Sequence, residues 1–236
     1  MTMRKAVLLD LDDTIFDHQH GRRSALAALM RVYPALAEHG IQKLESAHER
    51  HLQTTYSLRL AGQISHSDAR RKLVDLVFSD FGIALSNDQL HEVDSLYRRT
   101  YTANRRAVPG VIPIIMALKK TMKIAIVTNG FVTEQEEKVR LCGLDGKIDV
   151  LAISEKVGVK KPDKEIFHHV LSELQISASE AVMIGDSWRH DVLGARNAGI
   201  PAVWLNRYQA ECPEPGSAVE VTSLEPVDCL LRILIS

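Results

Sequence analysis

Acidic and polar side chains stand where several short apolar runs of this sequence end. Asp10 and Asp12 close one run, Thr128 and Asn129 close a second, and Asp186 closes a third. Carboxylates that converge repel one another by several kcal/mol unless a cation or a proton neutralises them. Because such a cluster offers only oxygen ligands, it favours a hard ion that keeps its waters, which means Mg²⁺ before zinc. Any one of these aspartates, taken alone, could instead cap a helix or start a turn.

The spacing of Asp10 and Asp12 points to covalent phosphoryl transfer. Where a strand ends and the chain turns, two carboxylates separated by one residue can face the same cavity. One can attack while the other moves protons, and a metal and a lysine can balance charge on the transferring oxygens. Lys156, Lys160 and Lys161 are the candidates for that lysine. Lys161 is favoured because the proline after it restricts its backbone at a predicted helix start.

Five apolar runs predict the strands that carry these side chains. They are continuous rather than alternating, which indicates strands buried on both faces, as in a parallel sheet. Helical patterns separate the last four runs, so we expect an α/β fold with a doubly wound parallel sheet covered by helices on both sides. Ligands of such sheets bind beyond the carboxyl ends of the strands. The strands are expected at residues 6–11, 124–128, 150–154, 181–186 and 202–205, and the helices at 110–120, 133–142, from 162 and 191–198.

Local signals predict where some of the helices begin. Thr133 with Glu136, and Ser86 with Gln89, have the spacing of a capping box. Pro162 suits the first position of a helix.

A long helical interval interrupts the α/β pattern after the first strand. Leucines and aromatic residues recur there at helical spacing, and four amphipathic helices are expected. Because the sheet pattern resumes afterwards, the interval is best described as an insertion. We therefore expect an α/β domain made of residues 1–16 and 108–236, and a small all-helical domain of residues 17–107.

Composition and charge exclude several classes of protein. A chain of 236 residues that is 45% hydrophobic and 25% charged is neither disordered nor fibrous. Its 29 basic residues balance 30 acidic ones, so no net field favours a nucleic acid polymer or an anionic membrane as partner. Cys142, Cys212 and Cys229 lack the spacing of a disulfide framework or a zinc site. With neither a signal peptide nor a run of about 18 apolar residues, a cytoplasmic protein is expected.

Four motifs together resemble the haloacid dehalogenase-like (HAD) hydrolase superfamily. One such motif is a weak signal, but four in the family's order, at predicted strand ends and helix starts over nearly the whole chain, are very specific. The resemblance implies a Rossmann-like HAD core, with the helical insertion as a C1-type cap that closes over the site and selects the leaving group. The motifs are DLDDT from Asp10, VTNG ending at Gly130, GVKKPD from Gly158 with Ile166-Phe167 after it, and GDS from Gly185 with Asp191.

The resemblance implies roles for the residues of the first two motifs. Asp10 would be the nucleophile that forms an aspartyl phosphate, and it would also bind Mg²⁺. Asp12 would protonate the leaving alcohol and then deprotonate the hydrolytic water, with its backbone carbonyl on the metal. Thr128 and the backbone amide of Asn129 would bind the phosphoryl oxygens.

The third and fourth motifs would supply charge balance and the rest of the metal site. By the same resemblance, Lys161 would neutralise the phosphoryl group and the nucleophile, and Asp186 would complete the metal site. Asp191 would hold metal waters or Lys161, although it could simply cap a helix that begins there.

The chain is thus predicted to be a Mg²⁺-dependent phosphatase for a small phosphorylated metabolite of the nucleotide or sugar phosphate type. Three alternatives stay open. A carbon–halogen hydrolase would use the same nucleophile but needs neither the metal nor Asp12. A phosphomutase would hand the phosphoryl group to a sugar, and a non-catalytic binding protein would be signalled by loss of Asp10 or Asp12, both of which are present. Whether the protein is a monomer or a homodimer is left undetermined.

Overall fold

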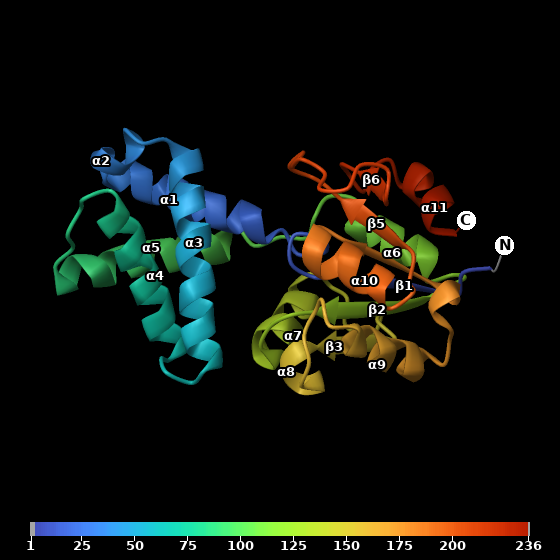
Figure 1. Ribbon diagram of the computed structural model, residues 1–236. Helices are drawn as coiled ribbons and strands as arrows, with labels where there is room; N and C mark the ends of the chain where they lie inside the picture. The colour runs from blue at the N-terminus through green and yellow to red at the C-terminus, as the bar shows by residue number, and fades with distance from the viewer. Residues whose placement is uncertain (1–2, 236) are drawn as a thin grey trace. The chain divides into compact units, whose positions relative to one another are not determined.

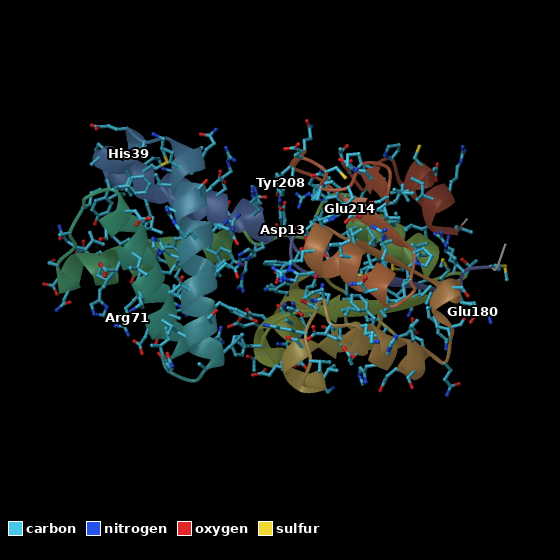
Figure 2. The ribbon with its side chains drawn as sticks, viewed as in Figure 1. Asp13, His39, Arg71, Glu180, Tyr208 and Glu214 are labelled. Atoms are coloured by element: carbon cyan, nitrogen blue, oxygen red, sulfur yellow. The ribbon has the colours of Figure 1, made fainter. Side chains whose placement is uncertain are left out.

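The computed structural model describes residues 3–235. The chain divides into two compact units (Figure 1). One is an α/β unit that runs to Asp17 and resumes at Arg106, and the other is a helical unit, His18–Arg105. Figure 2 labels His39 and Arg71 in the helical unit.

The α/β unit is built on a six-stranded parallel sheet with the order β3-β2-β1-β4-β5-β6. The chain runs outward from β1 to β3 and then crosses back to β4, so the order reverses between β1 and β4. This arrangement confirms the predicted doubly wound fold, and its ligand site is expected at that reversal. The strands are β1 (Ala6–Leu9), β2 (Lys123–Thr128), β3 (Val150–Ile153), β4 (Ala181–Gly185), β5 (Ala202–Leu205) and β6 (Val219–Val221).

Helices bury the central strands, of which β1 and β4 are inaccessible to solvent along their whole length. On one face, Ile166, Phe167 and Val170 of α9 pack in a cluster with Leu8 and Met183. Helix α6 contacts β2, and α11 packs against α6. The helices of this unit are α6 (Val111–Leu118), α7 (Val132–Leu141), α8 (Ser154–Val157), α9 (Lys164–Leu174), α10 (Gly194–Asn197) and α11 (Val227–Ile235). Ala178–Glu180 forms a 3₁₀ turn, and Trp188–Leu193 a π-helical turn.

Two elements of the α/β unit have no counterpart in the sequence prediction. Strand β6 is only three residues long, lies at the edge of the sheet and is largely exposed, so it has no continuous apolar run. Helix α11 has nine residues, too few for its helical period to stand out, although Leu230 and Leu234 are buried.

Two predicted helix starts are wrong. Helix α7 has no capping box at Thr133, because Phe131 is its N-cap and the amide of Val132 donates to the Glu155 carboxylate, 2.7 Å away. A tertiary contact therefore caps this helix. Helix α9 begins at Lys164, after the N-cap Asp163, and not at Pro162.

The helix predicted at 191–198 begins earlier and differently. Ser187 is the N-cap of the π-helical turn, which leads directly into α10. Asp191 therefore lies inside the turn rather than capping it.

The helical unit contains five helices rather than the four predicted, because Pro34 divides the first pattern. Leu26, Leu44, Phe78 and Tyr97 meet in its apolar core. The capping box of Ser86 and Gln89 is confirmed, with both of its hydrogen bonds present. The helices are α1 (His18–Val32), α2 (Pro34–Ala37), α3 (Ile41–Leu60), α4 (His66–Asp80) and α5 (Asn87–Ala103). Within residues 3–235, none of the helices combines the length and the apolar character that crossing a membrane requires.

Candidate active site

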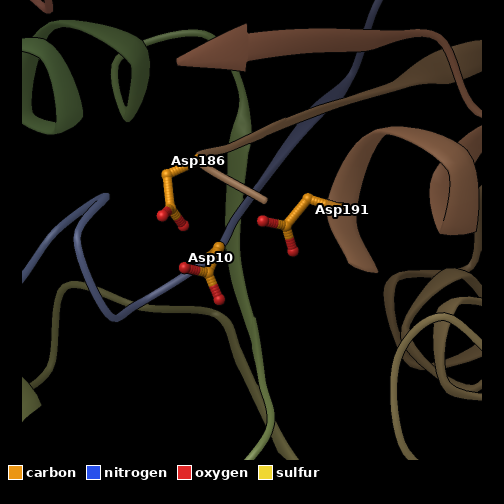
Figure 3. Close-up of side chains that lie close together, drawn as sticks. All are labelled: Asp10, Asp186 and Asp191. Atoms are coloured by element: carbon orange, nitrogen blue, oxygen red, sulfur yellow. The ribbon is translucent and has the colours of Figure 1, made fainter. Parts of the chain in front are cut away.

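Three aspartates meet at the carboxyl ends of β1 and β4. Asp10 follows β1, and its amide donates to the carbonyl of Ile184, the neighbouring residue of β4. Carboxylate oxygens of Asp10, Asp186 and Asp191 lie within 4.8 Å of one another. Figure 3 shows the three side chains lying close together. The structure thus brings together side chains from two strand ends and one helical turn at the reversal of the sheet order.

Lys161 stands against this cluster. Its Nζ donates to Oδ1 of Asp10 at 2.5 Å and to Oδ1 of Asp191 at 2.6 Å. The lysine is 3% exposed and Asp191 only 1%, so both charges are removed from water. Of the three lysine candidates, Lys161 alone is buried, whereas Lys156 and Lys160 are exposed.

Hydrogen bonds to the backbone hold these side chains in place. The amide of Lys161 donates to Oδ1 of Asn129, and the Asn129 side-chain amide donates back to the carbonyl of Lys161. Oδ2 of Asp191 accepts from the amide of Ser187 at 2.9 Å. Thr14 accepts from the amide of Asp186 through its hydroxyl, 3.1 Å away. Asn129 and Thr14 therefore fix the backbone of Lys161 and Asp186, and Ser187 fixes the carboxylate of Asp191.

The cluster carries more negative charge than Lys161 can balance. Burial raises the pKa of Asp10 to about 7, although Lys161 works in the opposite direction. Burial and the nearby carboxylates of Asp10 and Asp191 also raise the pKa of Asp186 well above its ordinary value. For Lys161, burial favours the neutral amine, but the two carboxylates outweigh it and raise the pKa. A set of oxygen donors that are buried or, at Asp186, half-buried, with excess negative charge, fits a hard divalent cation such as Mg²⁺.

Asp12 lies in a different environment from Asp10. Lys138 of α7 donates through Nζ to both of its carboxylate oxygens, at 2.7 Å each. Gln135 of the same helix donates to Oδ2 of Asp12 at 3.2 Å and to the hydroxyl of Thr128 at 2.7 Å. The Asp12 side chain is therefore not part of the three-aspartate cluster. Gln135 connects Asp12 with Thr128.

Sequence reasoning missed Gln135 and Lys138. They stand inside a helix rather than at a strand end, and nothing in their type or spacing separates them from a solvated helix face. It also gave no role to Trp204, whose indole Nε1 donates to the Asp186 carbonyl at 2.8 Å. The glycine at position 130 is related to Gln135, because a Cβ added to Gly130 would lie 2.7 Å from Nε2 of Gln135.

The backbone next to the site has an unusual conformation. Asp13, which follows Asp12, has a φ of 60°, in the left-handed region. Its carbonyl accepts from Nη1 of Arg207 at 3.2 Å. Tyr208, labelled with Asp13 in Figure 2, has a pKa raised to about 12 by burial and by the Asp13 carboxylate.

Residues 4–199 match the haloacid dehalogenase-like hydrolase family. The chain belongs to this family. A glyceraldehyde 3-phosphate phosphatase of Methanopyrus kandleri is 30% identical to this HAD hydrolase over 94% of the chain and 93% of the relative. The pyrimidine 5′-nucleotidase YjjG of Escherichia coli is 38% identical, but the match covers only 52% of this chain and 56% of that protein.

A solved structure of the same family supports the fold of this HAD hydrolase. The HAD-hydrolase YfnB of Bacillus subtilis, crystallised with bound magnesium, superposes with a TM-score of 0.71 at 25% identity. The match covers 98% of this chain and 99% of YfnB. Both the fold and the family predicted from the four motifs are thereby confirmed.

Proposed function

We propose that this HAD hydrolase is a Mg²⁺-dependent phosphatase that cleaves a small phosphate monoester through an aspartyl phosphate on Asp10. The observation that carries the proposal is the placement of Asp10. It is 6% exposed, lies at the reversal of the sheet order, bonds to Lys161 and faces two further carboxylates. A nucleophile held beside a cation site is what phosphoryl transfer requires, because catalysis of that reaction is mainly positioning and charge balance.

In the first step, an Asp10 oxygen attacks phosphorus, and the bond from phosphorus to the ester oxygen breaks. The departing oxygen takes a proton from the Asp12 carboxylic acid. In the second step, ionised Asp12 takes a proton from water, whose oxygen bonds to phosphorus as the Asp10 oxygen leaves. Inorganic phosphate and the regenerated Asp10 carboxylate result. Thr128 and the amide of Asn129 bind phosphoryl oxygens, while Lys161 balances their charge.

The carboxylates of Asp10, Asp186 and Asp191, with the backbone carbonyl of Asp12, would hold the Mg²⁺. The ion supplies positive charge to a site whose own residues carry an excess of carboxylates over ammonium groups. Its positive charge would also favour the ionised forms of Asp10 and Asp186 and so oppose the rise in their pKa values.

The relatives support a phosphate monoester as substrate. The Methanopyrus kandleri protein, named as a glyceraldehyde 3-phosphate phosphatase, resembles this chain over nearly the whole length of both. The likeness to the nucleotidase YjjG covers about half of each. We propose a small nucleotide or sugar phosphate, and we assign to the helical unit, His18–Arg105, the role of a cap that selects it.

A substrate panel tests this function. The purified protein is incubated with phosphate monoesters and with a short-chain 2-haloacid, with and without Mg²⁺, beside Asp10→Asn and the exposed control Asp145→Asn. We expect phosphate release that needs Mg²⁺, is lost in Asp10→Asn and survives in Asp145→Asn. Release that persists without metal, or in Asp10→Asn, overturns the mechanism. Halide release would establish the carbon–halogen alternative, and transfer of the phosphoryl group to a second sugar would establish a mutase.

A further inference from the structure

The carboxylate of Asp12 accepts hydrogen bonds from two residues of helix α7. Nζ of Lys138 lies 2.7 Å from each of its oxygens, and Nε2 of Gln135 lies 3.2 Å from Oδ2. The two residues are three positions apart, which places them on the same face of a helix. The Lys138 side chain is 16% exposed, and that of Asp12 is 32% exposed. An aspartate as open as Asp12 has several rotamers available to it, and these two partners restrict them.

Gln135 joins the ends of two strands. It is 1% exposed, and its Nε2 donates to the Thr128 hydroxyl at 2.7 Å and to the Asn129 carbonyl at 3.1 Å, as well as to Asp12. One amide group therefore connects the residue proposed to move protons with the residue proposed to bind the phosphoryl group. A glutamine that only completes the polar face of a helix would be exposed to solvent, whereas Gln135 is buried and bonded to three residues.

Gly130 makes this position of Gln135 possible. A Cβ on Gly130 would lie 2.7 Å from Nε2 and 2.8 Å from Cδ of Gln135, closer than real side-chain contacts. Gly130 is not among the glycines with positive φ, so its backbone does not require glycine. Its role is to leave room for the amide.

We propose that Gln135 and Lys138 are positioning residues for the acid–base steps, which they serve by holding the Asp12 carboxylate toward the departing oxygen. This inference rests on the proposed function. A proton passes only when donor and acceptor lie within about 2.6–3.2 Å, so a carboxylate that swings between rotamers spends little time in reach. In this role, Gln135 and Lys138 act on the proton transfer through Asp12.

The effect of losing this hold on Asp12 should depend on the leaving group. An alkyl phosphate expels a strongly basic alkoxide, so cleavage of its ester bond needs the proton from Asp12. The p-nitrophenolate ion is stable without that proton. Because kcat/KM reports the steps up to loss of the leaving group, p-nitrophenyl phosphate bypasses the acid step in this parameter. A merely structural weakening of the site would lower kcat/KM for both substrates alike.

The test compares Gln135→Met, Lys138→Met and Lys138→Arg with the exposed control Arg140→Met on the same helix. We expect kcat/KM for propyl phosphate to fall about 10- to 100-fold in the two methionine variants, as for loss of a group that orients a reacting one. For p-nitrophenyl phosphate it should change less than about threefold in Lys138→Met, and Lys138→Arg should recover most of the alkyl activity. Gln135→Met also removes the bonds to Thr128 and Asn129, so kcat/KM should fall for both substrates, and more for propyl phosphate. In an Asp12→Asn background, Lys138→Met should not lower kcat/KM further.

The outcomes separate this inference from the proposed function. In Lys138→Met, equal losses on both substrates, no loss on either, or a further loss in the Asp12→Asn background would overturn the positioning role of Lys138. In Gln135→Met, a loss no larger for propyl phosphate than for p-nitrophenyl phosphate would overturn that of Gln135. If Gln135→Met does not fold, Lys138→Met decides, since its side chain lies nearer the surface. Failure of wild-type protein to cleave any phosphate monoester of the substrate panel, or cleavage by Asp10→Asn, would overturn the function itself.

Discussion

Nζ of Lys161 lies 2.5 Å from Oδ1 of Asp10, although the two residues are 151 positions apart in the chain. Both are more than nine-tenths buried, so each charge depends on the other for neutralisation. The same ammonium bonds to Asp191. Lys161 therefore links the proposed nucleophile to the proposed metal site.

Replacing Lys161 by methionine should damage both activity and stability. Two buried carboxylates would lose their shared ammonium, and we expect kcat/KM for a phosphate monoester to fall by at least about 10²-fold. Without added Mg²⁺, the free energy of unfolding should fall by about 3 kcal/mol, as when one partner of a buried ion pair is removed. Steady-state kinetics and urea titration measure the two effects. Lys160→Met, at an exposed position, is the control, and equal behaviour of the two variants would refute the role of Lys161.

Gly185→Ala should weaken Mg²⁺ binding. A Cβ at this position would lie 2.4 Å from Cγ of Asp191, so the carboxyl group must move. Asp191 would then lose its bonds to the Ser187 amide and to Lys161. We expect the Mg²⁺ concentration for half-maximal activity to rise about tenfold, as for disturbed support of a metal ligand. An unchanged Mg²⁺ titration would show that Asp191 does not serve the metal.

Asp17 should contribute to the stability of the α/β unit. The residue is 1% exposed, and its carboxylate accepts from Nη2 of Arg106 at 2.8 Å and from Nη2 of Arg207 at 3.1 Å. Asp17→Asn should lower the free energy of unfolding by about 2 kcal/mol, the value of hydrogen bonds to charged groups. Thermal and urea unfolding, with the exposed Asp145→Asn as reference, measure this loss. Identical unfolding of the two variants would show that the ion pairs add nothing.

His48 should make the helical unit sensitive to acid. Burial, and then the charge of Arg22, lower the pKa of His48 to about 3, and its Nε2 lies 2.8 Å from the hydroxyl of Tyr97. The unfolded chain therefore binds a proton that the folded chain does not. The stabilisation is fully present above about pH 6.5 and is lost as pH falls from there toward about pH 3. At pH 5.5 the loss should be about 1.4 kcal/mol.

Urea titrations of wild-type protein and His48→Gln between pH 7.5 and 4.5 test this prediction. The difference between their free energies of unfolding should shrink as the pH falls, because only wild-type protein must keep a buried imidazole neutral. His91→Gln, at an exposed position in the helical unit, is the control. A difference that stays constant across the range would contradict the account.

The parts of the site that the sequence predicted are those that end buried strands. Asp10 and Asp186 follow continuous apolar runs, and parallel strands deliver their carboxyl ends to one edge of the sheet. Their neighbourhood therefore follows from the strand pattern alone. The proline after Lys161 favoured this lysine over its neighbours, and the family resemblance added Asp191.

The parts that could not be predicted depend on tertiary contacts. Gln135 and Lys138 lie on a helix whose polar residues look like an ordinary solvated face until β1 and β2 are placed beside it. The start of α7 is capped by Glu155, 23 positions away, so no local signal marks it. Asp191 is aimed by a π-helical turn, a conformation with no simple sequence period.

Trapping the phosphoryl group on Asp10 tests the central claim most directly. Wild-type protein and Asp12→Asn are mixed with Mg²⁺ and p-nitrophenyl phosphate, quenched in acid within the first turnover, and mapped by peptide mass spectrometry. We predict a phosphorylated peptide that contains Asp10, with greater accumulation in Asp12→Asn, because the base for the hydrolytic water is missing. Release of p-nitrophenol with the Asp10 peptide unmodified in both proteins would contradict the account.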